Sequence, residues 1–204
     1  MARGVALPPG VVLAGGASRR MGGGDKGLLP LGRSTVMGLA IARLGPQVST
    51  LAINANGDPA RLAALGLPVL PDPVEGRPGP LAGVLAAMEW AAGRGAERVA
   101  TVAADTPFLP MDLVARLAEA GPGIALAATP GEGGRPVRHP TFGLWPVALA
   151  GDLRAALGAG VRKVVEWTDR HGAAAALFPE EDAFFNVNTP EDLARARAMA
   201  QALP

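Results

Sequence analysis

The chain of 204 residues contains no cysteine, which excludes disulfides, zinc–thiolate sites and thiol catalysis. Charge is also scarce, because only 18% of the residues are charged and the net charge is +1. Proteins that bind the backbone of DNA or RNA need a clustered basic surface, so this charge gives no support for that class. No apolar run approaches the length of a membrane span, and the proline-broken N-terminus does not predict a signal peptide. We therefore expect a cytoplasmic enzyme with no nucleic-acid or membrane partner.

Lysine is nearly absent as well, yet one of the two lysines lies inside a glycine-rich loop. The chain has Lys26 and Lys163 against seventeen arginines. An apolar run at residues 11–14 leads into Gly15 and Gly16, and Arg20 and Lys26 follow. Glycines let such a loop turn its backbone N–H groups toward one point, and the added cations make that point a phosphate site. A compact ammonium suits a crowded triphosphate better than a guanidinium does.

The common phosphate-binding motifs do not fit this loop. Lys26 follows Asp25 and precedes Gly27, whereas a Walker A lysine follows glycine and precedes serine or threonine. The dinucleotide pattern Gly-x-Gly-x-x-Gly is also absent after the apolar run. A plain glycine-rich surface loop explains the segment less well, because strand, glycines and cations occur together at one topological position.

Apolar runs alternate with helical patterns along the first 130 residues, which favours a parallel sheet with crossover helices. The strands that we expect there are residues 10–14, 48–54, 68–71, 98–103 and 123–129. The expected helices are residues 34–44, 59–65, 81–92 and 110–120. Ser34 and Asp58 are the predicted N-caps of the first two helices.

The second half of the chain is less regular. A turn is predicted at residues 131–136, with strands at 141–145, 173–178 and 184–187. Helices are predicted at residues 147–157, 161–171 and 190–203, the last one capped by Thr189. With no repeat and no linker visible, we expect one domain over residues 1–204. Within it, residues 1–130 bind the nucleotide, and residues 131–204 add a part for a second substrate.

Glycines or residues with polar side chains follow successive strands of the expected sheet. They are Gly15 with Gly16, Asn54, Asp72 and Asp105. Since ligands of open parallel sheets bind beyond the carboxyl ends of the strands, all of these residues should face one crevice. Asn54 could equally be a turn residue.

Asp105 ends a predicted strand, where aspartate is depleted. Taken alone, it is as good a helix cap as a metal ligand. Asp112 lies nearer to the next helix start, however, and a carboxylate opposite a phosphate loop suits Mg²⁺, or Mn²⁺ in its place. Asn186 and Asn188 flank a valine in an expected short strand, so their amides should point to one side. Thr189 is best explained as a helix cap.

The motifs together resemble those of the molybdenum cofactor guanylyltransferases, a family of nucleotidyltransferases. The segments are Leu13–Gly16 with Arg20-Met21-Gly22 and Asp25-Lys26, then Gly79-Pro80-Leu81-Ala82-Gly83, Asp105-Thr106-Pro107, and Asn186-Val187-Asn188-Thr189-Pro190. They run in order over almost the whole chain. Ala104 stands where the family often has cysteine. The resemblance implies an α/β fold of three layers with a mostly parallel Rossmann-like sheet, of the nucleotide-diphospho-sugar transferase type.

The resemblance also implies roles for individual residues. Arg20, Lys26 and Asp105 become the catalytic residues, and Asp105 with Asn188 holds Mg²⁺ or Mn²⁺. The implied nucleotide site comprises Leu13, Ala14, Gly15, Gly16, Lys26, Asn54, Asp72, Gly79 and Asp105.

The acceptor site is the least defined part of this assignment. Arg135, Arg138 and His139 lie within five residues and could hold a phosphate and a pterin, together with Asn186. A lone histidine before proline is more often a turn residue. We interpret His171, at a helix end before Gly172, as a cation that complements the helix dipole, with no catalytic role.

The implied reaction joins GMP from GTP to the terminal phosphate of molybdopterin and releases pyrophosphate. The implied partners are GTP, molybdopterin, and cofactor-synthesis or molybdoenzyme-chaperone proteins. One rival is a cytidylyltransferase acting on the same pterin or on another phosphorylated acceptor. Such relatives commonly have Ala-Ala-Gly where this chain has Ala14-Gly15-Gly16, and the smaller residue leaves room for a purine. The other rival is a nucleotide-sensing or partner-binding subunit, which would not need Lys26, Asp105 and Asn188 together.

Overall fold

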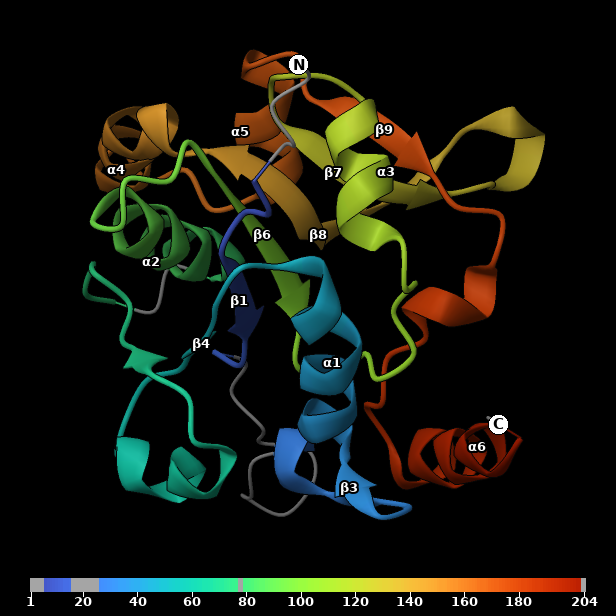
Figure 1. Ribbon diagram of the computed structural model, residues 1–204. Helices are drawn as coiled ribbons and strands as arrows, with labels where there is room; N and C mark the ends of the chain where they lie inside the picture. The colour runs from blue at the N-terminus through green and yellow to red at the C-terminus, as the bar shows by residue number, and fades with distance from the viewer. Residues whose placement is uncertain (1–5, 16–25, 77–78, 203–204) are drawn as a thin grey trace.

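The computed structural model describes residues 6–15, 26–76 and 79–202, and these form a twisted sheet covered on both faces by helices (Figure 1). Along the sheet the strand order is β5-β4-β1-β6-β8-β7-β9, and only β8 runs against the others. Its strands are β1 Gly10–Leu13, β4 Leu51–Asn54, β5 Val69–Leu70, β6 Arg98–Ala103, β7 Ala125–Thr129, β8 Val137–Pro146 and β9 Ala174–Leu177. A small antiparallel pair, β2 Pro30–Leu31 and β3 Ser34–Thr35, lies outside the sheet. The mostly parallel α/β fold is therefore confirmed.

The two faces of the sheet carry separate hydrophobic cores because successive side chains of a strand alternate between them. The α-helices that cover them are α1 Val36–Leu44, α2 Pro80–Ala92, α3 Leu113–Glu119, α4 Ala150–Gly158, α5 Val164–Arg170 and α6 Pro190–Gln201. Val12 of β1 belongs to the core beneath α1 and α3, whereas Val11 belongs to the core beneath α2, α4 and α5. A third, smaller core joins Val187 and α6 to β2 and α1.

Short 3-10 helices fill several connections. They are η1 Lys26–Leu28, η2 Gly45–Gln47, η3 Pro59–Leu65, η4 Glu132–Gly134, η5 Val147–Leu149 and η6 Glu181–Phe184. Residues 59–65 therefore form a 3-10 helix, although Asp58 caps it as predicted by accepting from Ala60 N–H. None of the described helices is both long and apolar enough to cross a membrane.

Two predictions of local structure are wrong. Thr35, not Ser34, caps α1, because its hydroxyl accepts from Gly38 N–H while Ser34 pairs with Leu31 in the small antiparallel sheet. Residues 184–187 form no strand. Phe184 ends η6, and the Val187 side chain is buried against α6 instead.

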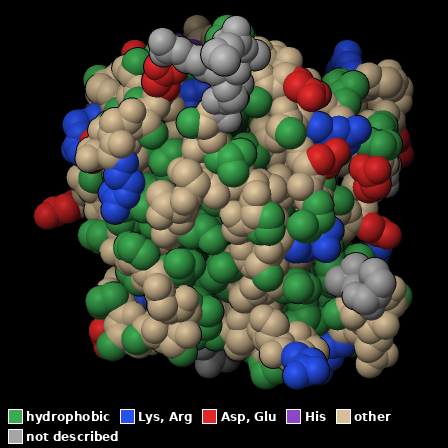
Figure 2. All heavy atoms as spheres, in the orientation of Figure 1, with side chains coloured by type: hydrophobic (Ala, Val, Ile, Leu, Met, Phe, Trp, Pro, Cys, Tyr) green, Lys and Arg blue, Asp and Glu red, His purple; other side chains and the backbone are tan. Residues whose placement is uncertain are grey.

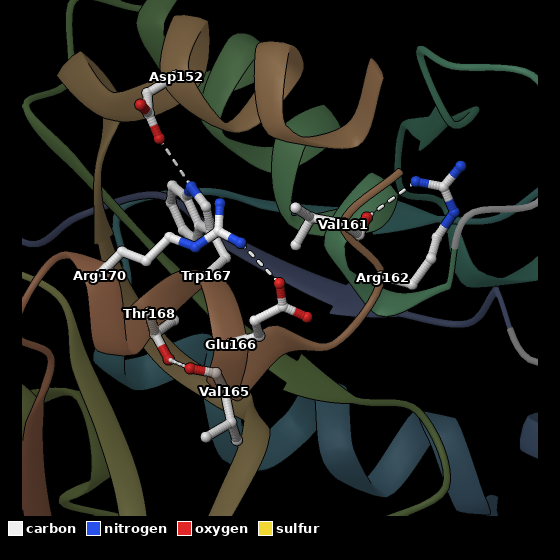
Figure 3. A network of polar contacts seen from close by, with 8 residues as sticks. All are labelled: Asp152, Val161, Arg162, Val165, Glu166, Trp167, Thr168 and Arg170. Carbon is white, nitrogen blue, oxygen red and sulfur yellow. Dashed lines mark hydrogen bonds and ion pairs between the residues drawn. The ribbon is translucent and has the colours of Figure 1, made fainter. Parts of the chain in front are cut away.

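Side chains of α4 and α5 form a polar network, part of which is drawn in Figure 3. Asp152 of α4 accepts from the indole N–H of the fully buried Trp167 at 2.7 Å, and His171 contacts the same carboxylate at 2.8 Å. These hydrogen bonds lower the pKa of Asp152, first through Trp167 and then through His171. His171 ends α5 before Gly172, as predicted, and its partner there is a carboxylate.

On the face shown in Figure 2, hydrophobic and uncharged side chains cover most of the centre. Lysine, arginine, aspartate and glutamate are scattered around the rim and mixed in sign. This face carries no dominant basic patch, in agreement with the low net charge.

Candidate active site

A cleft of about 560 Å³ lies along the carboxyl ends of the parallel strands. Its wall includes segments that follow β1, β4, β5 and β6, together with the first half of β8. Nearly all of the described residues that the sequence predicted for the site line this cleft, and Arg135 and Arg138 are the exceptions. The predicted residues that line it are Leu13, Ala14, Gly15, Lys26, Asn54, Asp72, Gly79, Asp105, His139, Asn186 and Asn188. Gly16 and Arg20 lie outside the described residues.

At one end of the cleft, three polar side chains hold one another in place. The Asn54 amide donates to Asp72 Oδ1 at 2.9 Å and to the carbonyl oxygen of Leu70 at 3.1 Å. The Asn56 amide donates to Asp72 Oδ2 at 2.7 Å, and Asp72 N–H donates back to Asn56 Oδ1. Both carboxylate oxygens of Asp72 are therefore fixed before any ligand arrives. Since Asn54 is almost completely buried at 2% exposure, this end of the cleft is rigid.

Gly83 of α2 makes room for Asn54. A Cβ atom at Gly83 would lie 2.3 Å from Asn54 Oδ1 and 3.1 Å from Leu13 Cδ2. No side chain but hydrogen fits there unless Asn54 moves. The last glycine of the Gly79-Pro80-Leu81-Ala82-Gly83 segment thus supports the neighbouring polar cluster.

The loop after β1 approaches this cluster closely. Ala14 N–H donates to the carbonyl oxygen of Asn54, and a Cβ at Gly15 would lie 3.6 Å from Asn54 Oδ1. A side chain at Gly15 would therefore not clash with Asn54. Its absence leaves the backbone of this loop exposed to the cleft.

Asp105 lies at the middle of the cleft, two residues beyond the end of β6. Burial raises the pKa of this carboxyl, and its backbone hydrogen bond, the charge of Lys26 and the Thr106 hydroxyl oppose the rise. The Thr106 hydroxyl also bonds to Asn186 Oδ1, and Val187 N–H donates to the carbonyl oxygen of Asp105. A segment 80 residues further along the chain is thereby tied to the end of β6.

Lys26 begins η1 and reaches across to the same distant segment. Its Nζ donates to Asn188 Oδ1 at 3.1 Å. Asn188 is held by the start of α6, where the Asp192 carboxylate accepts from the N–H groups of Asn188 and Thr189. Thr189 caps the helix as predicted, in a reciprocal capping box with Asp192. The two asparagines are placed by these contacts, not by the strand that the sequence had predicted for them.

The other end of the cleft is formed by an irregularity in β8. Leu126 of β7 pairs with Gly143, but the next residue, Ala127, pairs with His139. Residues 140–142 have no partner on β7 and bulge into the cleft wall. The buried hydroxyl of Thr101 donates to the carbonyl oxygen of Thr141 at 2.8 Å and fixes this bulge to β6.

Arg135 and Arg138 are not brought into the cleft wall. Arg135 is exposed beyond η4, and the Arg138 guanidinium pairs with Asp169 of α5. Their assignment to the acceptor stays a prediction, and His139 and Asn186 are the members of that group that line the cleft.

Comparison with known proteins identifies the family of the chain. Residues 10–174, from β1 to the start of β9, match the model of the MobA-like NTP transferase domain. The chain belongs to the MobA-like NTP transferase family. The matched residues include Lys26, Asp105 and His139, whereas Asn186 and Asn188 lie beyond them.

Members of the family with high identity cover nearly the whole chain. A molybdenum cofactor guanylyltransferase of Cereibacter sphaeroides is 55% identical over 190 residues, which are 93% of this chain and 95% of that protein. Another, from Mesorhizobium japonicum, is 50% identical over 95% of this chain and 96% of its own length. These matches cover so much of the chain that they include the segment that holds Asn186 and Asn188.

Solved structures share the fold at lower identity. The molybdopterin-guanine dinucleotide biosynthesis protein A of Archaeoglobus fulgidus superposes with a TM-score of 0.71 at 22% identity, covering 96% of this chain and all of that chain. A 2-C-methyl-D-erythritol 4-phosphate cytidylyltransferase of Thermus thermophilus has the same TM-score and identity over 97% of this chain and all of its own. The fold is therefore the nucleotide-diphospho-sugar transferase type that the sequence predicted, and it does not separate guanylyl from cytidylyl transfer.

Sequence reasoning missed several residues that shape the cleft. Asn56 shares Asp72 with Asn54, and the Asn-Ala-Asn spacing was the signal for it. Thr106 was visible only as the neighbour of Asp105. Phe142 and Phe184 had no signal, because the ring contacts that place them depend on the bulge in β8.

Proposed function

We propose that this chain transfers GMP from GTP to the terminal phosphate of molybdopterin and releases pyrophosphate. The observation that carries the proposal is the meeting of Lys26, Asp105 and Asn188 at one point of the cleft, from three distant parts of the chain. A subunit that only binds a nucleotide would need the Asn54–Asp72 cluster but not Lys26, Asp105 and Asn188 together. The relatives at 50–55% identity carry the name of the same reaction.

The Asn54–Asp72 cluster is the proposed guanosine end. Both oxygens of the Asp72 carboxylate are already oriented by amides, and each keeps a lone pair for a ligand. Guanine presents the adjacent donors N1–H and N2–H, which suit a fixed carboxylate, whereas adenine has no donor at N1. Gly15 and Gly79 line the same end of the cleft and let a purine ring approach the backbone.

The groups around Asp105 fit a divalent cation of the Mg²⁺ kind. No cluster of three or more histidine, aspartate or glutamate side chains is found among the described residues, so one carboxylate with amide oxygens and phosphates would have to suffice. Magnesium is commonly held in this way, by one or two carboxylates together with substrate phosphates and water. Asp105 supplies the carboxylate, and Asn186 and Asn188 present amide oxygens beside it. When bound, the cation would neutralise phosphate charge.

The chemistry then needs no covalent enzyme intermediate. An oxygen of the acceptor phosphate attacks the α-phosphorus of GTP, the new O–P bond forms, and the bond from the α-phosphorus to the bridging oxygen of the β-phosphate breaks. Pyrophosphate leaves with the bonding electrons. The attacking phosphate is already an anion, so no general base is required. Lys26 stabilises charge on the phosphates, and catalysis consists of positioning and charge neutralisation.

Pyrophosphate release with molybdopterin and each of the four nucleoside triphosphates tests the proposal. We expect release with GTP to exceed release with CTP, ATP and UTP, because the fixed Asp72 carboxylate matches guanine. Faster turnover with CTP would replace the assignment by a cytidylyltransferase. Absence of turnover despite tight GTP binding would favour a sensor.

A further inference from the structure

The end of the cleft formed by β8 carries an aromatic ring that the proposed chemistry does not use. His139 lines the cleft, and its imidazole stacks on Phe184 with ring centroids 4.2 Å apart and planes only 8° from parallel. Phe142 meets both rings edge-on, at 6.4 Å from His139 and 5.1 Å from Phe184. Phe184 is buried and is not part of the cleft wall. Phe184 therefore covers one face of the imidazole, and the imidazole forms part of the cleft wall.

Two features of the structure fix the position of this ring. The bulge at residues 140–142 turns the start of β8 into the cleft, and bulges beside active sites commonly redirect side chains in this way. Thr129 Oγ1 and His139 Nε2 lie 3.1 Å apart, a hydrogen bond that fixes the plane of the ring. Burial lowers the pKa of His139, so the ring is neutral at neutral pH and is not an additional phosphate cation. Its Nδ1 makes no hydrogen bond within the described part of the chain.

The order of the strands places this ring where an acceptor has to lie. Asp72 follows β5, Asn54 ends β4, Asp105 follows β6, and His139 is on β8, next to β6 in the sheet. At about 4.8 Å per strand, β5 and β8 are about 19 Å apart. With guanosine at β5 and β4 and its phosphates between β1 and β6, the β8 end is free for the second substrate.

We infer that the imidazole of His139, backed by Phe184, is a stacking platform for the pterin ring of the acceptor. This inference rests on the proposed function for its choice of ligand. A neutral aromatic face stacks on a flat heterocycle without competing for the acceptor phosphate, which stays beside Asp105.

Four variants test the platform, and each is assayed in two ways. His139→Phe keeps a flat ring, His139→Leu keeps bulk without a π face, and His139→Ala removes both. Thr129→Val keeps the imidazole and removes the hydrogen bond that fixes its plane. The first assay measures KM for molybdopterin, kcat, and the Kd of GTP. The second titrates protein into free pterin and follows quenching of pterin fluorescence, which needs no turnover.

For His139→Ala and His139→Leu we expect an increase of about tenfold in the molybdopterin KM and the pterin Kd, with GTP affinity unchanged. His139→Phe should retain near-parental values, and Thr129→Val, whose imidazole is no longer held in its plane, should raise both constants less than His139→Ala does. Unchanged pterin affinity in both His139→Ala and His139→Leu would overturn the platform, as would a His139→Phe variant as weak as His139→Ala. If the parental protein fails to transfer GMP, the proposed function is lost, while the pterin titration still decides the platform separately.

Discussion

Two parts of the cleft are assembled in different ways: the proposed guanosine end, and the part around Lys26, Asp105 and Asn188, which we call the reacting centre. At the guanosine end, the bonds joining Asp72 to Asn54 and Asn56 span 18 and 16 residues of the chain. At the reacting centre, the bond from Lys26 to Asn188 spans 162 residues, and the bond from Thr106 to Asn186 spans 80. The polar cluster of the guanosine end needs only the pairing of β4 with β5. The reacting centre exists only after α6 has packed against the rest of the molecule.

Under the proposed function, this difference separates nucleotide binding from catalysis. A rigid local cluster can select the nucleotide, and a distant segment completes the site where charge develops. Changes at the reacting centre should therefore lower kcat with little effect on the fold, whereas changes at the guanosine end should weaken GTP binding.

Asp105→Asn should have the largest effect. The amide keeps the shape and removes the charge that a cation needs, so we expect turnover to fall by more than about a hundredfold. Turnover is measured across titrations with Mg²⁺ and Mn²⁺, and circular dichroism checks the fold. A folded variant with parental turnover and an unchanged metal requirement would remove Asp105 from the site and make the Asn186–Asn188 pair the leading ligands.

Lys26→Ala should lower kcat by about a hundredfold, the usual cost of losing one electrostatic stabiliser. The side chain lies in a loop and its one described hydrogen bond is to Asn188, so the free energy of unfolding should change little. Stopped assays for pyrophosphate give kcat, and thermal melts provide the control. Near-normal kcat would mean that the triphosphate lies elsewhere.

Gly83→Ala should damage the guanosine end alone. The added methyl group would collide with Asn54 Oδ1 and displace the amide from Asp72. We expect the GTP Kd to rise roughly tenfold, equivalent to about 1.4 kcal/mol. Overpacking should also lower stability by about 1–3 kcal/mol.

Gly151→Ala in α4 is the matched control for this variant. Apart from the backbone of its own helix and its chain neighbours, nothing lies within 4 Å of its added Cβ, so the same substitution should stabilise the helix by about 0.5–1 kcal/mol and leave GTP binding unchanged. Calorimetric titration with GTP compares the two. Equal affinities in both variants would show that Gly83 does not support the guanosine end.

Asp152→Ala should affect neither end of the cleft and should have the smallest effect. It removes the acceptor for the buried Trp167 indole, so we expect a loss of about 1 kcal/mol in the free energy of unfolding at pH 7. The pKa of Asp152 is lowered in the folded state from its ordinary 3.8, so its contribution is lost as pH falls through that lowered pKa. The difference between parent and variant in urea titrations should shrink below pH 4 or so, and a constant difference would contradict the ionic contribution.

The sequence predicted that Asn54 and Asp72 would lie in one cleft, because they follow strands whose apolar runs are readable and whose carboxyl ends must meet at one edge. Asp58 and Thr189 were found as helix caps for a similar reason, since capping depends on a few adjacent residues. Asn186 and Asn188 were placed in a strand because Phe-Phe-Asn-Val has the composition of one. Their actual position depends on Val187 being buried against α6 and on the bonds to Asp105 and Lys26, which no local pattern encodes.

The bulge in β8 could not be predicted from neighbouring residues either. Residues 141–145 were predicted as a strand, but the structure extends β8 from Val137 to Pro146 with a register shift in the middle. That shift follows from pairing with β7 and from the Thr101 hydroxyl, both far away in sequence. Consequently His139 could be named for the acceptor but not its partner Phe184.

Transfer of labelled phosphate tests the central claim most directly. The purified chain is incubated with molybdopterin and GTP labelled at either the α- or the γ-phosphate, and the products are separated. The account predicts that α-label enters the molybdopterin product in step with pyrophosphate release, while γ-label appears only in pyrophosphate. Label from the γ-phosphate in the acceptor, or α-label recovered only as free GMP or GDP, would contradict it.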